Sequence, residues 1–283
     1  MSNNNEHAPT APLLDLLHAR YGTHESSAPE GADQNDILKA LLSHRSVRAY
    51  RTDPLPAGTL ELLIAAAQSA ASSANLQAFS VVAVEDPARK ARLASLCRDQ
   101  RHIIEAPLFL VWLADLSRLQ RVAGSTNVRA NGLEYLESFL LAVIDATLAA
   151  QNAAVAAESL GLGTVYIGAL RNRPEEVAAE LALPPQVLPV FGLVVGYPDE
   201  SRPAEIKPRL PVSAILHREQ YAVANESTSL AAYDTTLAAF QTSQQLPPIG
   251  WTKAATKRVQ DGEALGARVR LAEAVKNLGF TLT

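Results

Sequence analysis

The stretch from residue 133 to residue 160 constrains the fold more than any other part of this chain. It contains no glycine and no proline, and alanine, leucine and valine occupy most of its positions. We expect one long helix of roughly 28 residues, which at about 1.5 Å per residue measures about 42 Å. A helix that is apolar nearly all round must be buried on most sides, and a subunit interface is one way to bury it. Gly161 and Gly163 are expected to end this helix.

Apolar runs before and after this helix predict a β-sheet. The runs at 107–114 and 187–196 are almost continuously apolar, which is typical of strands buried on both faces. Shorter strands are expected at 79–84 and 164–167. Helical patterns separate these strands and indicate a layered α/β or α+β architecture. The expected helices are 37–43 with Asp36 as N-cap, 56–71 opened by Pro56, 87–98 capped by Asp86, one turn at 101–105, and a helix that starts at Pro174.

The two ends of the chain are predicted to lie outside this core. Residues 1–35 form an N-terminal extension, in which Leu13, Leu14 and Leu17 share one face of a short helix, and no chemistry is readable there. Residues 36–221 form the core. Residues 222–283 form a C-terminal helical extension with helices at 229–242 and 262–278. Because this extension has no strand to pair with the sheet, we expect it to wrap a core, either its own or that of a second subunit.

Composition excludes several classes of function. The net charge of −4 and the pI near 5.9 disfavour nucleic acid, which requires a basic face. The one cysteine, Cys97, lies among apolar residues and is expected in the core, so disulfides and a cysteine-based metal site are excluded. No signal peptide and no run of about 18 apolar residues that would span a bilayer are found. These features predict a soluble, cytoplasmic protein.

The segment Ser43–Arg48 concentrates groups that bind anions. It carries two guanidiniums, an imidazole and two hydroxyls within six residues, directly after a predicted helix. The fork of donors on arginine matches phosphate oxygens in pairs, and serine and histidine add donors of shorter reach. The segment therefore resembles an anion clamp, and the alternative is a solvated charged turn. Because a helix C-terminus repels anions, the side-chain cations must supply the attraction.

Other common sites are disfavoured. Gly161 and Gly163 follow a helix and lack the third glycine of a dinucleotide-binding loop, so a Rossmann site is not expected. No nucleophile elbow is present, and the histidines lack metal-ligand spacing. His102 and His217 are interpreted as ordinary surface or turn residues.

The remaining polar and basic residues form a set of donors that are far apart in sequence. A flavin mononucleotide (FMN) requires cations for its phosphate, hydroxyls and amides for its ribityl chain, and backbone N–H groups near its ring. Gly168 lets the backbone approach a ring closely. Each member taken alone has an ordinary explanation as a helix end, a surface amide or a solvated charge. The set comprises His44, Arg45, Ser46, Arg48, Ser72, Ser73, Gln77, Gln100, Tyr166, Ile167, Gly168, Ala169, Lys207 and Arg209.

The chain resembles the nitroreductase family of flavoproteins, in particular its oxygen-insensitive nitroreductase and flavin reductase branch. The similarity covers roughly 36–221 and follows the order of the family's motifs. The matching stretches are Ser43–Arg48, Ala70–Gln77, Ala149–Ala153, Ala157–Gly163, Val165–Gly168, Leu188–Leu193 and Lys207–Pro211.

This resemblance implies an α+β fold with a central, mostly antiparallel sheet, a long helix at the interface of a homodimer, and tails that embrace the partner. It also implies bound FMN and a ping-pong cycle, in which NADH or NADPH delivers hydride to flavin N5 and a nitroaromatic, quinone or flavin then takes the electrons. The cofactor carries the chemistry, so no catalytic side chain and no metal are expected. Alternatives are a flavin reductase that feeds a partner monooxygenase, and a flavin-binding protein without turnover.

The resemblance also implies roles for individual residues. His44, Arg45, Ser46 and Arg48 would hold the phosphate and ribityl end, with Lys207 and Arg209 adding to the phosphate or the polar edge of the ring. Ser72 and Gln100 would bind ribityl or ring polar groups, and Ser73 and Gln77 are also expected to bind the cofactor. The backbone of Tyr166–Ala169 would face the flavin, with the Gly168 N–H near N5. Asn75 and Arg171 would border the substrate pocket.

Three positions depart from the family pattern. Asn75 stands where relatives carry a larger apolar or aromatic residue, which bears on the range of acceptors. Ala169 replaces a common glycine. Leu246–Trp251 lacks the basic pair that meets the 2′-phosphate of NADPH in this branch, which weakens the case for NADPH over NADH unless Lys253, Lys257 or Arg258 substitutes.

Overall fold

The computed structural model describes residues 12–22, 32, 35–224 and 226–283. The chain folds into two compact units. Unit 1 comprises Met1–Arg45 and Glu205–Ala264, and unit 2 comprises Ser46–Ala204 and Leu265–Thr283. The boundary near Arg45 divides the predicted anion clamp: His44 and Arg45 belong to unit 1, and Ser46 and Arg48 belong to unit 2. The division of the chain at residues 35 and 221 that the sequence suggested stays a prediction.

Unit 2 is built on an antiparallel sheet of four strands. The strands are β1 (Phe79–Val84), β2 (Leu108–Asp115), β3 (Gly163–Ile167) and β4 (Val187–Gly196), in the order β1-β2-β4-β3. All three strand pairs are antiparallel, and a bulge interrupts the β2–β4 register at Trp112 and Leu113. The four predicted strands and the α+β class with an antiparallel sheet are thus confirmed.

The apolar run of strand β2 is continuous because helices pack on both of its faces. Phe109, Val111 and Leu113 pack into one core cluster with Leu93 of α4 (Pro87–Leu96) and Ile103 of α5 (Arg101–Glu105). The intervening side chains of β2 pack on the other face, against α3 (Thr59–Gln68) and α7 (Leu136–Ser159). Successive side chains of a strand alternate between the two faces of the sheet. A strand with helices packed on both faces is therefore apolar at every position.

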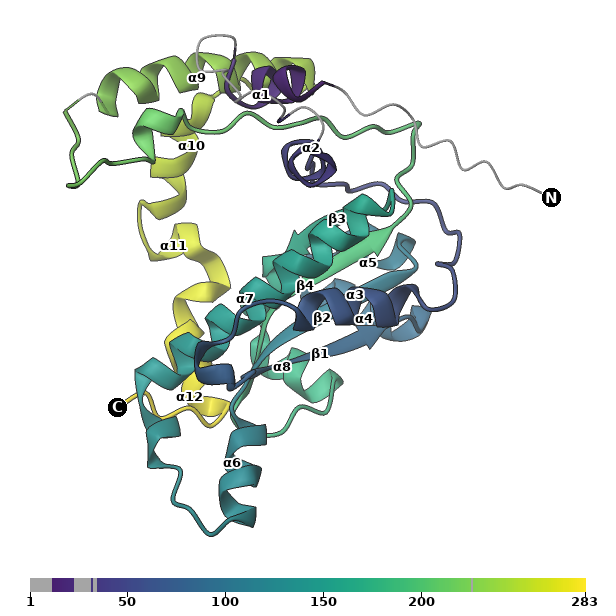
Figure 1. Cartoon of the computed structure of the whole chain (residues 1–283), viewed down its shortest axis with the longest axis vertical. Helices are drawn as coiled ribbons and strands as arrows, with labels where there is room; N and C mark the ends of the chain where they lie inside the picture. Colours follow the sequence, from purple (N-terminus) through teal and green to yellow (C-terminus); the bar gives the residue numbers. More distant parts are fainter. Residues whose placement is uncertain (1–11, 23–31, 33–34, 225) are drawn as a thin grey trace. The chain divides into compact units, whose positions relative to one another are not determined.

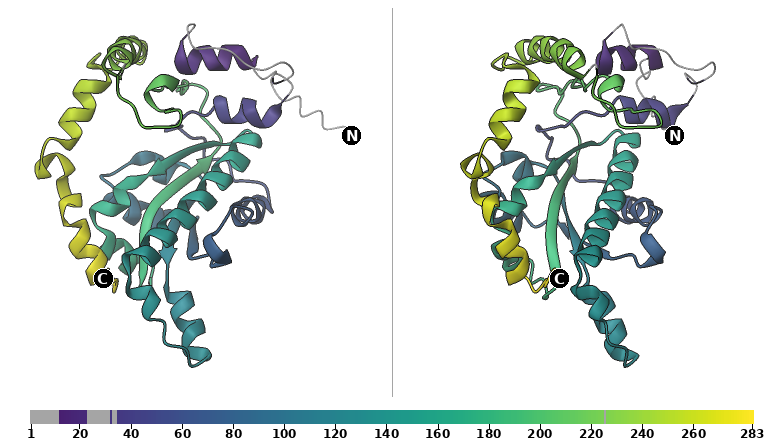
Figure 2. Two further views of the ribbon diagram at one scale, coloured as in Figure 1. Left: turned by 60° about the vertical axis from the view of Figure 1, so that its left-hand side comes forward. Right: turned by 90° about the vertical axis from the view of Figure 1, so that its left-hand side faces the viewer.

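The predicted long helix is present as α7, and it packs on the sheet (Figures 1 and 2). Its buried face consists almost wholly of alanines, from Ala142 to Ala157, which bring the helix backbone close to the strands. Contrary to the expectation from the sequence, α7 is long and apolar enough by length and composition to cross a bilayer, the one such helix in the described part of the chain. A core helix that is packed on a sheet shares these properties.

Several boundaries differ from those predicted. Asn35, not Asp36, is the N-cap of α2 (Asp36–Leu42), because its side chain accepts a hydrogen bond from Leu38 N. Helix α3 begins at Thr59 instead of Pro56, after Gly58 in a left-handed conformation. The predicted helix 262–278 is broken at Gly266 into α11 (Gly262–Leu265), the 3-10 helix η7 (Gly266–Arg270) and α12 (Leu271–Asn277). Two helices were not predicted, α6 (Ser117–Ser125) and α10 (Gly250–Val259).

Further elements complete both units. Unit 2 also contains the short helices η3 (Ser73–Asn75), η4 (Asn131–Glu134), η5 (Gly168–Asn172) and α8 (Pro174–Glu180). Unit 1 contains α1 (Leu13–Tyr21), α2, η6 (Val212–Ala214), α9 (Glu226–Ser243) and α10. In α1 the buried residues are Leu13, Leu16 and Arg20, whereas Leu14, which was expected on the buried face, is exposed. The predicted short helix in the N-terminal extension therefore exists, with a different buried face.

Candidate functional site

The clamp residues of unit 1 come from two segments that lie side by side. His44 and Arg45 follow α2, while Lys207 and Arg209 lie in an extended segment far along the chain. The carbonyl oxygens of His44 and Lys207 both accept hydrogen bonds from the Arg20 guanidinium. Within this unit, the fold therefore brings together four of the residues predicted to bind phosphate. Arg45, Lys207 and Arg209 are exposed and His44 is half-buried.

The rest of the predicted clamp runs along strand β3 in unit 2. Ser46 forms a parallel bridge with Thr164, and Val47 N donates a 2.9 Å hydrogen bond to the Thr164 carbonyl. A Cβ at Gly163 would lie 2.7 Å from the Val47 side chain, so the backbones meet there only because Gly163 has none. The Arg48 guanidinium is exposed, with Nη1 3.4 Å from the Ser46 carbonyl. The fold thus brings Ser46 and Arg48 to the strand that leads into Tyr166–Ala169.

Gly168 stands where β3 ends and η5 begins, between two guanidinium groups. A Cβ added to Gly168 would lie 3.2 Å from Arg171 Nη2 and 3.6 Å from Arg268 Nη2. Arg171 also donates to the Val190 carbonyl, and burial lowers the pKa of its guanidinium. Arg268 Nε donates to Asn172 Oδ1 at 3.0 Å. The predicted flavin-facing backbone is therefore flanked by positive charge.

Arg268 was missed by the sequence analysis. It lies in η7, about a hundred positions after Gly168, in a stretch whose sequence predicts only a helix. No spacing in the sequence links the two residues, because a contact in the tertiary structure brings them together. Arg98 extends the same positive region, since its Nη2 lies 3.1 Å from where a Cβ of Gly266 would stand.

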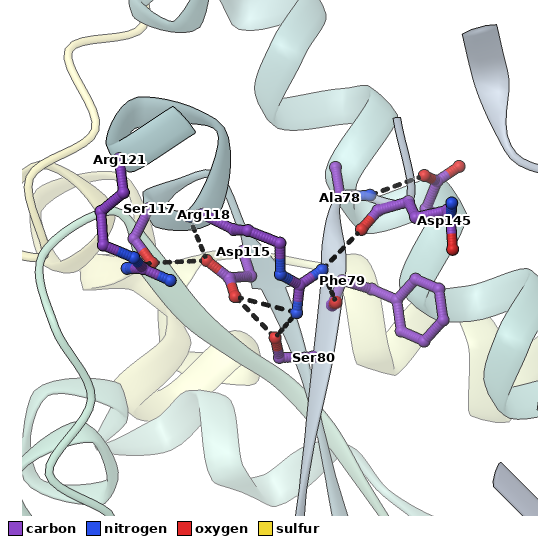
Figure 3. Close-up of polar contacts among 9 residues, drawn as sticks. Ala78, Phe79, Ser80, Asp115, Ser117, Arg118, Arg121 and Asp145 are labelled. Atoms are coloured by element: carbon purple, nitrogen blue, oxygen red, sulfur yellow. Dashed lines mark hydrogen bonds and ion pairs between the residues drawn. The ribbon is translucent and has the colours of Figure 1, made fainter. Parts of the chain in front are cut away.

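The loop Ser72–Gln77 is anchored by a buried carboxylate on α7. Asp145 is 2% exposed and accepts hydrogen bonds from Ser72 Oγ at 2.7 Å and from Ala78 N at 3.0 Å. Figure 3 shows Asp145 beside Ala78 and, next to them, Arg118, which donates to the Gln77 and Phe79 carbonyls. These bonds hold a loop in which Ala74, Asn75 and Gln77 have positive φ.

This anchoring limits what the predicted loop residues can do. The one hydroxyl proton of Ser72 is donated to Asp145, so Ser72 could meet a ligand only as an acceptor. Ser73, Asn75 and Gln77 are exposed. The loop precedes β1 at one edge of the sheet, while Tyr166–Ala169 ends β3 at the opposite edge. Unit 2 therefore does not bring these two groups of predicted residues together.

Cys97, Gln100 and His102 lie close together in the chain, around the start of α5. Gln100 is half-buried, and its amide donates to the Cys97 carbonyl at 2.8 Å. Cys97 is buried as expected, and burial raises the pKa of its thiol to about 12. His102 was expected at the surface but is 9% exposed, and burial, together with the charge of nearby Arg48, lowers its pKa. No metal-binding cluster occurs among the described residues.

Comparison with known proteins identifies the family. The model of the nitroreductase family matches residues 41–197, and the model of that family's C-terminal domain matches residues 207–283. The chain belongs to the nitroreductase family. The first match includes the segment from His44 to Gly168, and the second includes Lys207, Arg209 and Arg268.

Several named relatives of this chain are enzymes that reduce flavins or nitro compounds. An FMN reductase [NAD(P)H] of Bacillus subtilis (strain 168) is 43% identical over 71% of this chain and 80% of its own length. An oxygen-insensitive NADPH nitroreductase of Salmonella typhimurium is 39% identical over 72% and 81%. The solved NADPH:FMN oxidoreductase from Vibrio harveyi complexed with NAD+ is 31% identical, has a TM-score of 0.77, and covers 87% of this chain and 99% of that chain.

Proposed function

We propose that this nitroreductase is an FMN-dependent NAD(P)H oxidoreductase that reduces nitroaromatic compounds, quinones or free flavin. The observation that carries the proposal is the end of β3, where the Gly168 backbone is flanked by Arg171 and Arg268. The Ser46–Arg48 segment, held along β3 through Thr164, adds a hydroxyl and a third guanidinium. The names of the relatives support the same activity.

The chemistry of the available donors fits FMN. A phosphate that carries up to two negative charges requires several cations. Unit 1 offers His44, Arg45, Lys207 and Arg209, and unit 2 offers Arg48 together with the Ser46 hydroxyl. A ring edge requires close approach to a backbone N–H, and Gly168 has no side chain of its own to prevent that approach. When bound, FMN would accept two electrons from NADH or NADPH and pass them to the acceptor.

The protein's side chains would bind and orient the flavin, the nucleotide donor and the acceptor, and would not react themselves. Arg171 and Arg268 would attract anionic groups of the nucleotide donor or of the acceptor to the ring edge, because partly buried charges are weakly screened. Gln100 would offer its amide oxygen, and Ser73, Asn75 and Gln77 would offer polar groups from the anchored loop. Lys253 and Lys257 are exposed on α10, whereas Arg258 donates to the Ala264 carbonyl, so the two lysines are the better candidates for a 2′-phosphate.

Two features support a homodimer with flavin sites at its interface. Four apolar residues at intervals of four, Leu136, Leu140, Ile144 and Leu148, form an exposed stripe on α7 with 43–55% exposure. The Ser72–Gln77 loop and Tyr166–Ala169 lie at opposite edges of the sheet, so both can contact one flavin if the loop comes from the second copy. Residues 222–283 would then embrace the partner. We further propose that the enzyme is cytoplasmic and has no membrane or nucleic-acid partner.

Anaerobic titration of the FMN-loaded protein with NADH and NADPH in parallel tests this function. Bleaching of the flavin absorbance by either nucleotide, followed by reoxidation with a nitroaromatic or quinone, is expected. Protein that stays colourless after addition of FMN would contradict the cofactor assignment. Bound FMN that neither nucleotide bleaches would indicate a flavin-binding protein without turnover.

A flavin reductase that supplies reduced flavin to a partner monooxygenase is the second candidate, favoured by the relatives named as FMN reductases. Steady-state rates with free FMN and with a nitroaromatic separate the two. If the enzyme reduces free flavin at least as efficiently as nitroaromatics and hands it to an added monooxygenase, this second function holds.

A further inference from the structure

The N-terminal extension contributes a buried arginine to unit 1. Arg20, in the last turn of α1, is 5% exposed. A guanidinium that has left water must satisfy its donors with hydrogen bonds, because an unsatisfied buried charge is strongly destabilising. Arg20 lies before residue 41, where the match to the nitroreductase family model begins. The burial of Arg20 must therefore be explained by the contacts that it makes in this chain.

Arg20 donates three side-chain hydrogen bonds to the two segments that carry the clamp cations. Nη1 donates to the Lys207 carbonyl at 2.8 Å, and Nη2 donates to the Leu42 and His44 carbonyls at 2.8 and 2.9 Å. The backbone of the same residue adds a fourth bond, since the Arg20 carbonyl accepts from Arg209 N at 2.9 Å. One residue thus holds the turn after α2 against the segment 207–209.

The bonds also set which way the cations face. Pro208 is buried, and its carbonyl accepts a hydrogen bond from the Tyr233 hydroxyl at 2.9 Å. Because side chains alternate along extended backbone, burying Pro208 places its neighbours Lys207 and Arg209 together on the other side. Both are exposed. The bonds to Lys207 and Arg209 from Arg20 therefore fix the backbone from which two cations project.

Arg20 also changes the electrostatics at the end of α2. The carbonyls of the last turn of a helix carry partial negative charge, which opposes the binding of an anion there. The Leu42 carbonyl belongs to that turn and accepts from Arg20. A cation at a helix C-terminus offsets the negative end of the helix dipole. Arg20 thereby removes part of the repulsion that a phosphate near His44 and Arg45 would otherwise meet.

We infer that Arg20 is a positioning residue of the phosphate clamp, which aligns the His44 and Lys207 backbones and neutralises the end of α2. This inference rests on the proposed function, since the anion is taken to be the FMN phosphate. Lysine cannot replace arginine fully, because one ammonium cannot span the two segments with the geometry of a guanidinium fork.

Binding of FMN and of riboflavin to the apoprotein, followed by flavin fluorescence, tests the inference, because the two ligands differ only in the phosphate. Arg20→Ala is expected to weaken FMN binding by about tenfold, because the misaligned backbones would lose about one charge-assisted contact between the clamp cations and the phosphate. Riboflavin affinity should change by less than about twofold. Arg20→Lys keeps the charge and should give an intermediate loss. Arg89→Ala, which removes an exposed arginine paired with Glu180, is the matched control and should change neither affinity.

The outcomes separate the inference from the proposed function. A wild-type protein that binds neither ligand rejects the FMN site itself. If wild type binds FMN but Arg20→Ala keeps the wild-type ratio of FMN to riboflavin affinity, Arg20 is not a positioning residue of the clamp. An equal loss for both ligands also overturns the inference, because it indicates a general structural role. If Arg20→Ala does not fold, the same ratio measured for Arg20→Lys and Arg20→Gln decides.

Discussion

At the scale of single residues, the predicted site depends on cations whose positions are set by backbone contacts. Val47 N bonds to Thr164, and the Val47 side chain packs over Gly163, so the residues on either side of Val47 are held at β3. Arg48 therefore extends from a fixed backbone although its own guanidinium is exposed. An exposed side chain on a fixed backbone loses less conformational entropy on binding a ligand than one on a mobile loop.

Arg48→Ala is expected to weaken FMN retention by roughly tenfold or more, since a hydrogen bond to a charged group contributes about 1.5–3 kcal/mol. Equilibrium dialysis of FMN from wild type and variant measures the effect. Arg51→Ala, which removes a nearby exposed arginine paired with Asp53, serves as the control. Equal retention by Arg48→Ala and wild type would show that Arg48 is only a surface charge.

At the scale of secondary-structure elements, a buried carboxylate joins β1, β2 and α6. Asp115, at the end of β2, is 5% exposed and accepts hydrogen bonds from Ser80 Oγ and Ser117 Oγ, each at 2.6 Å (Figure 3). Arg118 N also donates to Asp115 at 3.2 Å. Burial alone would raise the pKa of this carboxyl, but the two hydroxyls and Arg118 outweigh it and lower the pKa below 3.8. The charged form is therefore the one that stabilises these elements.

The sign of the pH dependence follows from this shift. A carboxyl whose pKa is lower in the folded state stabilises the fold above its unfolded pKa of 3.8, and this stabilisation disappears as the pH falls through the folded pKa. Asp115→Asn should cost about 1–3 kcal/mol of unfolding free energy at pH 7, and the difference from wild type should shrink below pH 3.8. Urea denaturation across this range measures it.

Glu219→Gln, which removes one exposed carboxylate outside the helices and strands, controls for the change in net charge. Its unfolding free energy should follow that of wild type at every pH. A constant difference between Asp115→Asn and wild type down to the lowest pH would show that the hydrogen-bonded shape of the side chain, and not its charge, stabilises the three elements.

At the scale of the whole molecule, helix α7 exposes a continuous stripe of large apolar side chains, which is unusual for a helix packed on a sheet. Ile144 is 55% exposed at the middle of a helix whose opposite face is buried against the sheet. Contiguous exposed apolar residues mark interaction surfaces in soluble proteins. A second copy that packs on this stripe would bury α7 on most sides, as its composition requires.

Ile144→Glu is expected to convert a homodimer into monomers, because a buried carboxylate facing a second apolar stripe is strongly unfavourable. Sedimentation velocity measures the change in mass. If the partner supplies the Ser72–Gln77 loop to the flavin site, the variant should also bind FMN more weakly. Val122→Glu on α6, where Val122 is 54% exposed, is the matched control. A dimeric Ile144→Glu protein would place the interface elsewhere.

Much of the fold is determined by the sequence alone, because local patterns report burial. The run 107–114 predicts a strand covered on both faces, and β2 is fully buried. The absence of glycine and proline over 133–160 predicts α7 to within three residues at its start. The segment from His44 to Arg48 indicates an anion site because its cations are adjacent in the chain. Periodicity and adjacency are properties of neighbouring residues, so sequence can report them.

The tertiary structure alone decides which distant groups meet. Arg20 looks like an ordinary residue of a short helix, yet its guanidinium joins the His44 and Lys207 segments. Arg268 reaches Gly168 from the tail, and Asp145 anchors a loop some seventy residues earlier. Each contact depends on the path of the whole chain, and no local spacing encodes it. For the same reason the buried face of α1 includes Arg20 instead of Leu14, because packing partners, and not helical period alone, select the side chains that leave water.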